Sequence, residues 1–156
     1  MNAIDLLKKD HETVKHLLAQ ISATNDTSAK KRTELLDKIE MELTVHTALE
    51  EEILYPAFKQ AGKKQEEKMY FEAKEEHRTV DSMVLPDLKK TKPDSVEFSG
   101  RVKVLKELIE HHIEEEETEM FPDALNILGK RHLEELGVQM QTRQKELKAS
   151  LQRKAA

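Results

Sequence analysis

Histidine and glutamate recur at a fixed spacing in two places along this chain. His46 is followed four residues later by Glu50, and His112 is followed four residues later by Glu116. On a helix, side chains four residues apart are neighbours on one face, about 6 Å apart along the axis. Each pair is therefore suited to offer an imidazole and a carboxylate to one cation or to two neighbouring cations.

The two pairs belong to an internal repeat. His46 aligns with His112 (112 − 46 = 66), and two further histidines align with the same offset, His11 with His77 (77 − 11 = 66). Two helix pairs related by an approximate two-fold axis would place the repeated residues opposite one another. The six candidate metal ligands are His11, His46, Glu50, His77, His112 and Glu116.

These residue types point to metal binding rather than to a plain polar core. Unpaired imidazoles and carboxylates buried in a helix bundle cost free energy, because nothing replaces their lost hydration. Four neutral imidazoles and two carboxylates would leave a pair of divalent ions with open positions, which solvent or an external ligand must fill. The chain has no cysteine, so thiolate ligands and disulfides are excluded. Ligand softness alone suits iron, manganese or zinc.

The elements that must position these residues are helices. Charged residues make up 37% of the chain and aromatic residues 4%, with four glycines and four prolines, a balance typical of long helices with solvated faces. Apolar residues or histidines spaced alternately by four and three predict a first helix over about Ala3–Ser22. A loop follows at 23–28, and the second helix carries His46 and Glu50 toward Pro56, where we expect it to end or kink.

The second half of the chain repeats this plan. Gly62 marks a turn, the third helix carries His77 and kinks near Pro86, and a loop lies at 91–94. Asp94 with Glu97 resembles a capping pair that opens the fourth helix, which Pro122 interrupts. The sequence therefore predicts an all-α, up-down-up-down four-helix bundle with an additional C-terminal helix. We expect one domain over 1–156, with the bundle at about 3–128 and the added helix at about 130–152.

Charge and hydropathy limit the classes of binding partner that we expect. The formal net charge is −5, and no cluster of Lys and Arg is dense enough to follow a phosphate backbone, so nucleic acid is not an expected partner. No apolar run approaches the roughly 18 residues that span a bilayer, and the first residues lack the layout of a secretory signal. We therefore expect a soluble, cytoplasmic protein with no membrane partner. The sequence does not indicate a protein partner.

The arrangement of motifs resembles a known family. The first and third predicted helices each carry one candidate histidine, and the second and fourth each carry His-x-x-x-Glu followed by aromatic-Pro. This arrangement is similar to the hemerythrin-like family, or HHE cation-binding domain, over about residues 3–128. The resemblance implies a non-haem di-iron centre with an oxo or hydroxo bridge, four terminal histidine ligands, and Glu50 and Glu116 bridging the metals. It further implies binding of dioxygen or nitric oxide, or reactions with peroxide, in sensing or stress response.

One position departs from the family pattern. Oxygen-carrying hemerythrins have another histidine one turn before the third-helix ligand, where this chain has Ala73. Simple oxygen transport is therefore not expected. Water or hydroxide, Glu51, or Tyr55 swinging inward are the alternatives for the free coordination position. Tyr55 and Phe121, each preceding a proline, are also interpreted as apolar caps of the core.

Two other functions stay open at this point. One is a di-iron enzyme that reduces peroxide, dioxygen or nitric oxide; the other is a structural bundle with zinc or no metal. Glu119 stands where the other half has Ile53, and is interpreted as an exposed carboxylate, with a supplementary ligand or gate as the alternative. His16, His111 and His132 are interpreted as surface histidines.

Overall fold

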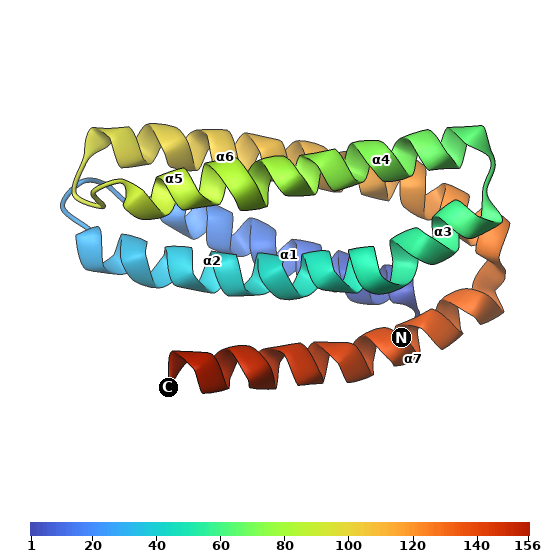
Figure 1. The fold of residues 1–156 in the computed structure, drawn as a ribbon. Coiled ribbons are helices and arrows are strands. Elements are labelled where there is room, and N and C mark those ends of the chain that lie inside the picture. The colour runs from blue at the N-terminus through green and yellow to red at the C-terminus, as the bar shows by residue number, and fades with distance from the viewer.

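The computed structural model describes residues 1–156 and is almost entirely helical (Figure 1). Its α-helices are α1 (Ala3–Ser22), α2 (Ala29–Leu49), α3 (Tyr55–Ala61), α4 (Lys64–Thr79), α5 (Leu85–Lys90), α6 (Val96–Glu115) and α7 (Phe121–Ala155). Three π-helices join them: η1 (Glu50–Leu54), η2 (Val80–Val84) and η3 (Glu116–Met120). None of these helices is both long and apolar enough to span a bilayer.

Four long rods form the bundle. α1 is the first rod, and the other three are the continuous runs α2–η1–α3, α4–η2–α5 and α6–η3 with the start of α7. They alternate in direction, with α1 and α2 on one side and α4 and α6 on the other (Figure 1). The rest of α7 runs back along α1 and α2. The predicted up-down-up-down bundle with an additional C-terminal helix is confirmed.

At the prolines, where we expected a helix end or a kink, each rod passes through a π-helix into a new α-helix. Pro56, Pro86 and Pro122 each lie in the first turn of an α-helix that directly follows a π-helix. Proline lacks an N–H group and its ring clashes with the carbonyl four residues earlier, so a regular α-helix cannot pass through it unchanged. The wider π turn, closed by an i to i−5 hydrogen bond such as Tyr55 N–H to Glu50 O, lets each rod continue.

The loop end of the bundle is fixed by one buried arginine. Arg32 is 1% exposed, and its guanidinium donates to carbonyl and hydroxyl oxygens on the α1–α2 loop and around the start of α6. It also lies over the Phe98 ring, 5.0 Å from the centroid. The predicted capping pair of α6 is wrong by one residue, because Ser95 accepts from the Phe98 backbone N–H.

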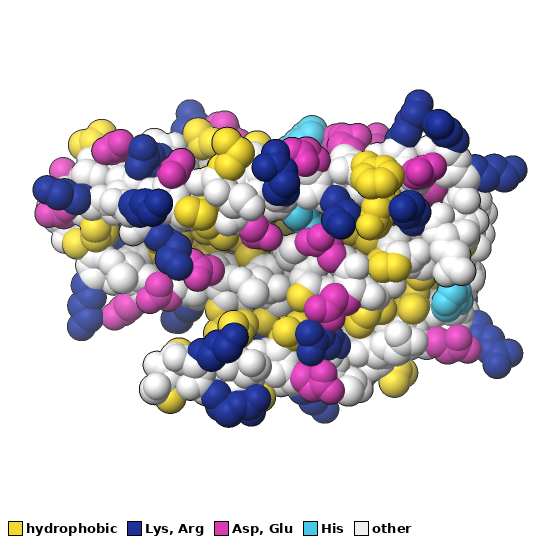
Figure 2. All heavy atoms as spheres, in the orientation of Figure 1, with side chains coloured by type: hydrophobic (Ala, Val, Ile, Leu, Met, Phe, Trp, Pro, Cys, Tyr) yellow, Lys and Arg dark blue, Asp and Glu magenta, His cyan; other side chains and the backbone are white.

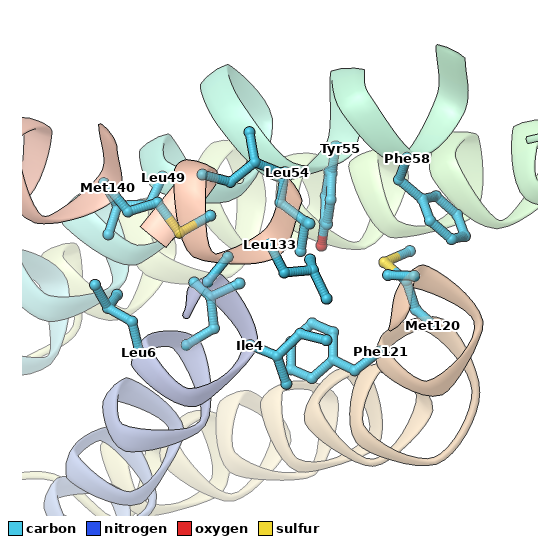
Figure 3. Close-up of a cluster of buried hydrophobic side chains, with 14 of the residues drawn as sticks. Ile4, Leu6, Leu49, Leu54, Tyr55, Phe58, Met120, Phe121, Leu133 and Met140 are labelled. Atoms are coloured by element: carbon cyan, nitrogen blue, oxygen red, sulfur yellow. The ribbon is translucent and has the colours of Figure 1, made fainter. Parts of the chain in front are cut away.

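The C-terminal part of α7 covers one face of the bundle. The break predicted at Gly129 is present, since this residue has φ +79°, a left-handed conformation that favours glycine. Beyond it, Leu133 and Met140 pack among apolar side chains of α1, α2 and η1 (Figure 3). This group forms one of two apolar clusters. The six candidate ligands belong to neither cluster, so apolar cores stabilise the bundle on both sides of a polar layer.

Candidate metal centre

The structure brings all six predicted residues together in that polar layer. Each is buried, with exposed fractions between 0% for Glu50 and 9% for His112. One ligand atom from each of His11, His46, Glu50 and Glu116 lies within 4.8 Å of the others, and Glu50, His77 and His112 form a second such group. The layer therefore contains two adjacent groups that share a carboxylate.

The first group joins α1 and α2. His46 Nε2 lies 2.5 Å from Glu50 Oε1, and His11 Nε2 lies 4.0 Å from the same oxygen. Glu116 reaches across from the opposite pair of rods and places Oε1 3.3 Å from His11 Nε2. The two imidazoles and the two carboxylates thus face one small volume.

The second group joins α4 and α6. His77 Nε2 and His112 Nε2 are 3.1 Å apart, and Glu50 Oε2 lies 3.0 Å from the former and 3.8 Å from the latter. Glu116 Oε1 lies 3.1 Å from His112 Nε2. Both carboxylates therefore contact histidines of both groups, which is the arrangement that bridging ligands require.

Each histidine is held from its outer side by a carboxylate. The Nδ1 atoms pair with acidic oxygens at 2.7 Å (His11–Glu117), 3.3 Å (His46–Asp10), 3.2 Å (His77–Glu51) and 2.8 Å (His112–Glu76). A carboxylate at Nδ1 fixes the ring and directs Nε2 inward, as at metal-binding histidines in general. These four braces follow the repeat, because 10 + 66 = 76 and 51 + 66 = 117.

Sequence reasoning missed these braces. Each lies next to a predicted ligand in the sequence, yet it serves a histidine on another helix. The repeated acidic neighbours Asp10-His11 and Glu76-His77 were the available signal. Glu51, one of the alternatives for the free coordination position, is occupied on the outer side of His77 instead.

Three inward-facing atoms test whether the residues fit a metal. His11 Nε2, Glu50 Oε1 and Glu116 Oε1 are buried and have no hydrogen-bond partner. Buried polar atoms of this kind cost free energy unless something binds them. A divalent cation between imidazole and carboxylate would satisfy all three, so the donor set fits a metal pair.

The charges in the layer are strongly coupled. Burial lowers the pKa of His46, but the carboxylates of Glu50 and Asp10 outweigh burial and raise it to about 10. The pKa of His77 is raised to about 9 in the same way, against burial, by Glu50 and Glu51. Burial favours the neutral form of Glu50, but the surrounding histidines hold its pKa well below the usual range. In the metal-free protein, imidazolium protons therefore occupy the place of cations.

Tyr55 adds a hydroxyl group to the polar layer. In an α-helix a residue five positions after Glu50 would lie about 140° away around the axis, but the π turn of η1 brings it back to the same face. Tyr55 Oη lies 2.7 Å from Glu50 Oε2 and 2.8 Å from Glu116 Oε2. It is also 3.3 Å from His77 Nε2 and 3.4 Å from His112 Nε2.

The repeat partner of Tyr55 is Phe121 (55 + 66 = 121). Tyr55 stacks on His77 at 5.4 Å and Phe121 stacks on His11 at 5.7 Å, so the aromatic rings also obey the repeat. Only the His77–His112 pair of histidines has a hydroxyl beside it. Burial, followed by the charges of Glu116 and Glu50, raises the pKa of Tyr55 well above its ordinary value.

A cavity of about 330 Å³ opens beside the centre. All four candidate histidines line it, and its other walls include the apolar side chains of Val14, Leu43, Val80, Ile109 and Ile113. A volume of this size admits a diatomic molecule or a peroxide with room to spare. The lining also includes the carboxylates of Glu72, Glu75, Glu76 and Asp81, so the cavity has an apolar part and an acidic part.

Comparison with known proteins gives the same assignment as the motifs. The family model described as Hemerythrin HHE cation binding domain matches residues 2–124. The chain belongs to this family. The hemerythrin-like match thus covers the whole polar layer with all six residues.

Individual relatives agree with this membership. A crystal structure of an HHE domain-containing protein, the Rv2633c homolog from Mycobacterium kansasii, superposes with a TM-score of 0.83 at 30% identity, covering 96% of this chain and 89% of that one. The uncharacterized protein Rv2633c of Mycobacterium tuberculosis is 30% identical over 96% of this chain and 89% of its own length. A Nostoc protein named DNA nickase is 30% identical over 86% of this chain. This hemerythrin-like chain spans only 37% of that relative.

Proposed function

We propose that the protein holds two iron ions between His11, His46, His77 and His112, with Glu50 and Glu116 bridging them, and binds dioxygen, nitric oxide or peroxide there. The observation that carries the proposal is the convergence of three unpartnered buried atoms, His11 Nε2, Glu50 Oε1 and Glu116 Oε1. Each carboxylate contacts histidines of both groups, which supports a pair of ions rather than one.

The chain's own residues prepare this centre. Bound iron would supply redox chemistry and open coordination positions for a small ligand. The outer carboxylates hold each imidazole with Nε2 inward, and the 330 Å³ cavity leaves room for a small ligand beside all four histidines. Iron is preferred over zinc or manganese on family membership, since the ligand set suits all three.

Anaerobic loading tests this proposal. The protein is treated with ferrous salt under argon, freed of excess metal, and titrated with nitric oxide and with azide while optical and EPR spectra are recorded. We expect saturable spectral changes at one stoichiometric equivalent per metal pair. Glu50→Ala, which removes the bridge to both groups, should abolish them, whereas Glu114→Ala on the exposed surface should not. If the protein binds metal but shows none of these spectral changes, as a zinc site would, the iron assignment is contradicted.

Tyr55 favours a second candidate function, the catalytic reduction of peroxide or dioxygen with electrons from an external reductant, which the assay must supply. Its hydroxyl contacts both bridging carboxylates and the His77–His112 group, on the side where Ala73 takes the place of the histidine found in oxygen carriers. The raised pKa keeps the phenol protonated, so its hydroxyl can donate a hydrogen bond to a reacting ligand, and a proton source is what reduction of peroxide or dioxygen requires beyond simple binding.

Tyr55→Phe separates the two candidates, because its repeat partner Phe121 shows that a phenyl ring packs well in this position. For an enzyme, we expect multiple turnovers of peroxide per metal pair in the wild type, and a rate at least tenfold lower in Tyr55→Phe, within the usual contribution of a proton donor. Stoichiometric binding without turnover would leave the sensor or carrier function.

A further inference from the structure

A second group of possible ligands lies outside the buried layer. His111 Nε2 is 3.0 Å from Glu115 Oε1 and 3.9 Å from Glu76 Oε2, and one ligand atom from each residue lies within 4.8 Å of the others. Ligands of one divalent ion, each about 2.0–2.2 Å from it, have this mutual spacing. The His111 side chain is 61% exposed and the two carboxylates are 24% and 32% exposed, so the group faces solvent.

A small cavity connects this group with the buried centre. It has a volume of about 30 Å³, enough for a water or a bare ion. Its lining includes Glu76 and Glu115 of the outer group, the further carboxylates Glu72 and Glu119, and the candidate ligands His112 and Glu116. Glu116 is 1% exposed and carries an unpartnered Oε1. The cavity therefore leads from an acidic surface toward Glu116, whose Oε1 lies 3.3 Å from His11 Nε2 and 3.1 Å from His112 Nε2 in the buried centre.

Glu76 belongs to both places. Its Oε1 pairs with His112 Nδ1 at 2.8 Å, while its Oε2 lies 3.9 Å from His111 Nε2. One carboxylate thus joins the outer group to a histidine of the centre. Figure 2 shows histidine atoms beside gathered acidic side chains along the edge formed by α4 and α6.

The first half of the chain has nothing comparable at the equivalent positions. Subtracting 66 from 72, 111, 115 and 119 gives 6, 45, 49 and 53, which are Leu6, Val45, Leu49 and Ile53. The first three are buried and all four belong to or pack on the apolar cluster that includes Leu133 and Met140 of α7. The acidic surface is therefore specific to the second half.

We propose that His111, Glu76 and Glu115 form an outer divalent-cation site, with Glu72 and Glu119 beside it, through which metal enters the buried centre. The entry role depends on the proposed metal pair, but cation binding at the outer site does not. The acidic surface concentrates cations, His111 and the carboxylates replace part of their hydration, and the cavity passes them to Glu116 and His112. Covering this face with a helix, as α7 does on the other half, would close the route.

Manganese binding tests the outer site by itself. The buried centre is first filled with Zn²⁺, and Mn²⁺ is then titrated while the EPR signal of free Mn²⁺ is recorded. We expect one saturable Mn²⁺ per chain, with affinity at least tenfold weaker in His111→Gln and in Glu115→Gln. The matched control is Glu97→Gln, a 66% exposed carboxylate at the start of α6, which should bind as the wild type does. Absence of binding in the wild type, or equal binding in all variants, overturns the outer site.

Uptake kinetics test the entry role. Ferrous ion is mixed with metal-free protein under argon, and the rate of loading is followed separately from the final iron content. We expect His111→Gln, which leaves the formal charge unchanged, and Glu115→Gln to load about tenfold more slowly while reaching the wild-type content. Equal rates overturn the entry role. If the wild type takes no iron into the centre, the proposed function fails instead, and the Mn²⁺ titration still decides the outer site.

Discussion

The two halves of this bundle are alike inside and different outside. Inside, each half supplies two histidines, one bridging carboxylate, two acidic braces and one stacked aromatic ring, all related by the same offset. Outside, the α1–α2 face is apolar and covered by α7, whereas the equivalent α4–α6 face carries His111 and a group of carboxylates. The two halves therefore share the residues around the centre but differ in their outer surfaces.

The comparison also shows where the internal symmetry is broken. Of the four candidate histidines, the Tyr55 hydroxyl lies near His77 and His112, and Phe121, which stacks on His11, has no hydroxyl. One hydroxyl and one acidic surface thus fall on the same half of the centre. We therefore assign both metal entry and proton supply to the His77–His112 side, whereas the apolar α1–α2 face is covered by α7.

The largest expected effect concerns the interior that the halves share. His46 and His77 have pKa values of about 10 and about 9 in the folded metal-free protein, above the ordinary ~6.5 of the unfolded chain. Their contribution is therefore complete below pH ~6.5 and is lost as the pH rises through 9 to 10. Between pH 7 and pH 10 the metal-free protein should lose stability on the order of several kcal/mol. Chelator-treated samples unfolded by denaturant at both pH values check this, and equal stability would contradict the coupled charges.

Removing the cover should be the next largest effect. Leu133 is 1% exposed against the α1–α2 face, so Leu133→Ala should lower the free energy of unfolding by about 2–5 kcal/mol. Val138→Ala is the matched control, because Val138 on the same helix is 63% exposed and its loss should change stability by less than about 0.5 kcal/mol. Similar denaturation midpoints for the two variants would mean that α7 does not stabilise this half.

Where the two halves meet at the loop end, Arg32→Ala should cost about 2–4 kcal/mol. The guanidinium donates to oxygens of both loops and of Ser99 on α6, and alanine would leave these partly buried acceptors without their donor. Thermal unfolding of Arg131→Ala, at an arginine that is 93% exposed, provides the control. A loss no larger than in that control would show that water replaces the Arg32 contacts.

A smaller effect should distinguish the braces of the two halves. Asp10→Asn and Glu76→Gln each weaken the support of one histidine, and loss of such a carboxylate typically costs 10–100-fold in metal affinity. The repeat predicts comparable losses for the two variants at equilibrium. Only Glu76→Gln should also slow iron uptake, since Asp10 has no outer site beside it. Calorimetric affinities combined with loading rates check both expectations, and slow loading in Asp10→Asn would count against a one-sided entry route.

Much of the fold and of the candidate site could be predicted from the sequence, because both follow the internal repeat. Two motifs with one offset located all six inward-facing residues, and helical periodicity gave α1 its observed ends. The braces Asp10 and Glu117 could not be predicted in the same way, because their partners lie 36 and 106 residues away. A contact of that kind depends on how helices pack against each other.

Two other features were missed for physical reasons. The prolines predicted an end or a kink but not a π turn, since a proline shows where an α-helix must change but not how the chain adapts. The π turn places the Tyr55 hydroxyl in the centre, so the inward position named as one alternative describes it better than a purely apolar cap. Arg32 gave no signal, because several of its acceptors are backbone carbonyl oxygens, and any residue type supplies those.

The proposed pair of iron ions can be located by anomalous X-ray diffraction at the iron absorption edge, from crystals of anaerobically loaded protein. We expect two peaks in the polar layer, one beside His11 and His46 and the other beside His77 and His112, with Glu50 and Glu116 between them. A polar layer without anomalous peaks, or with a single peak held by one group of histidines, would contradict the two-metal centre.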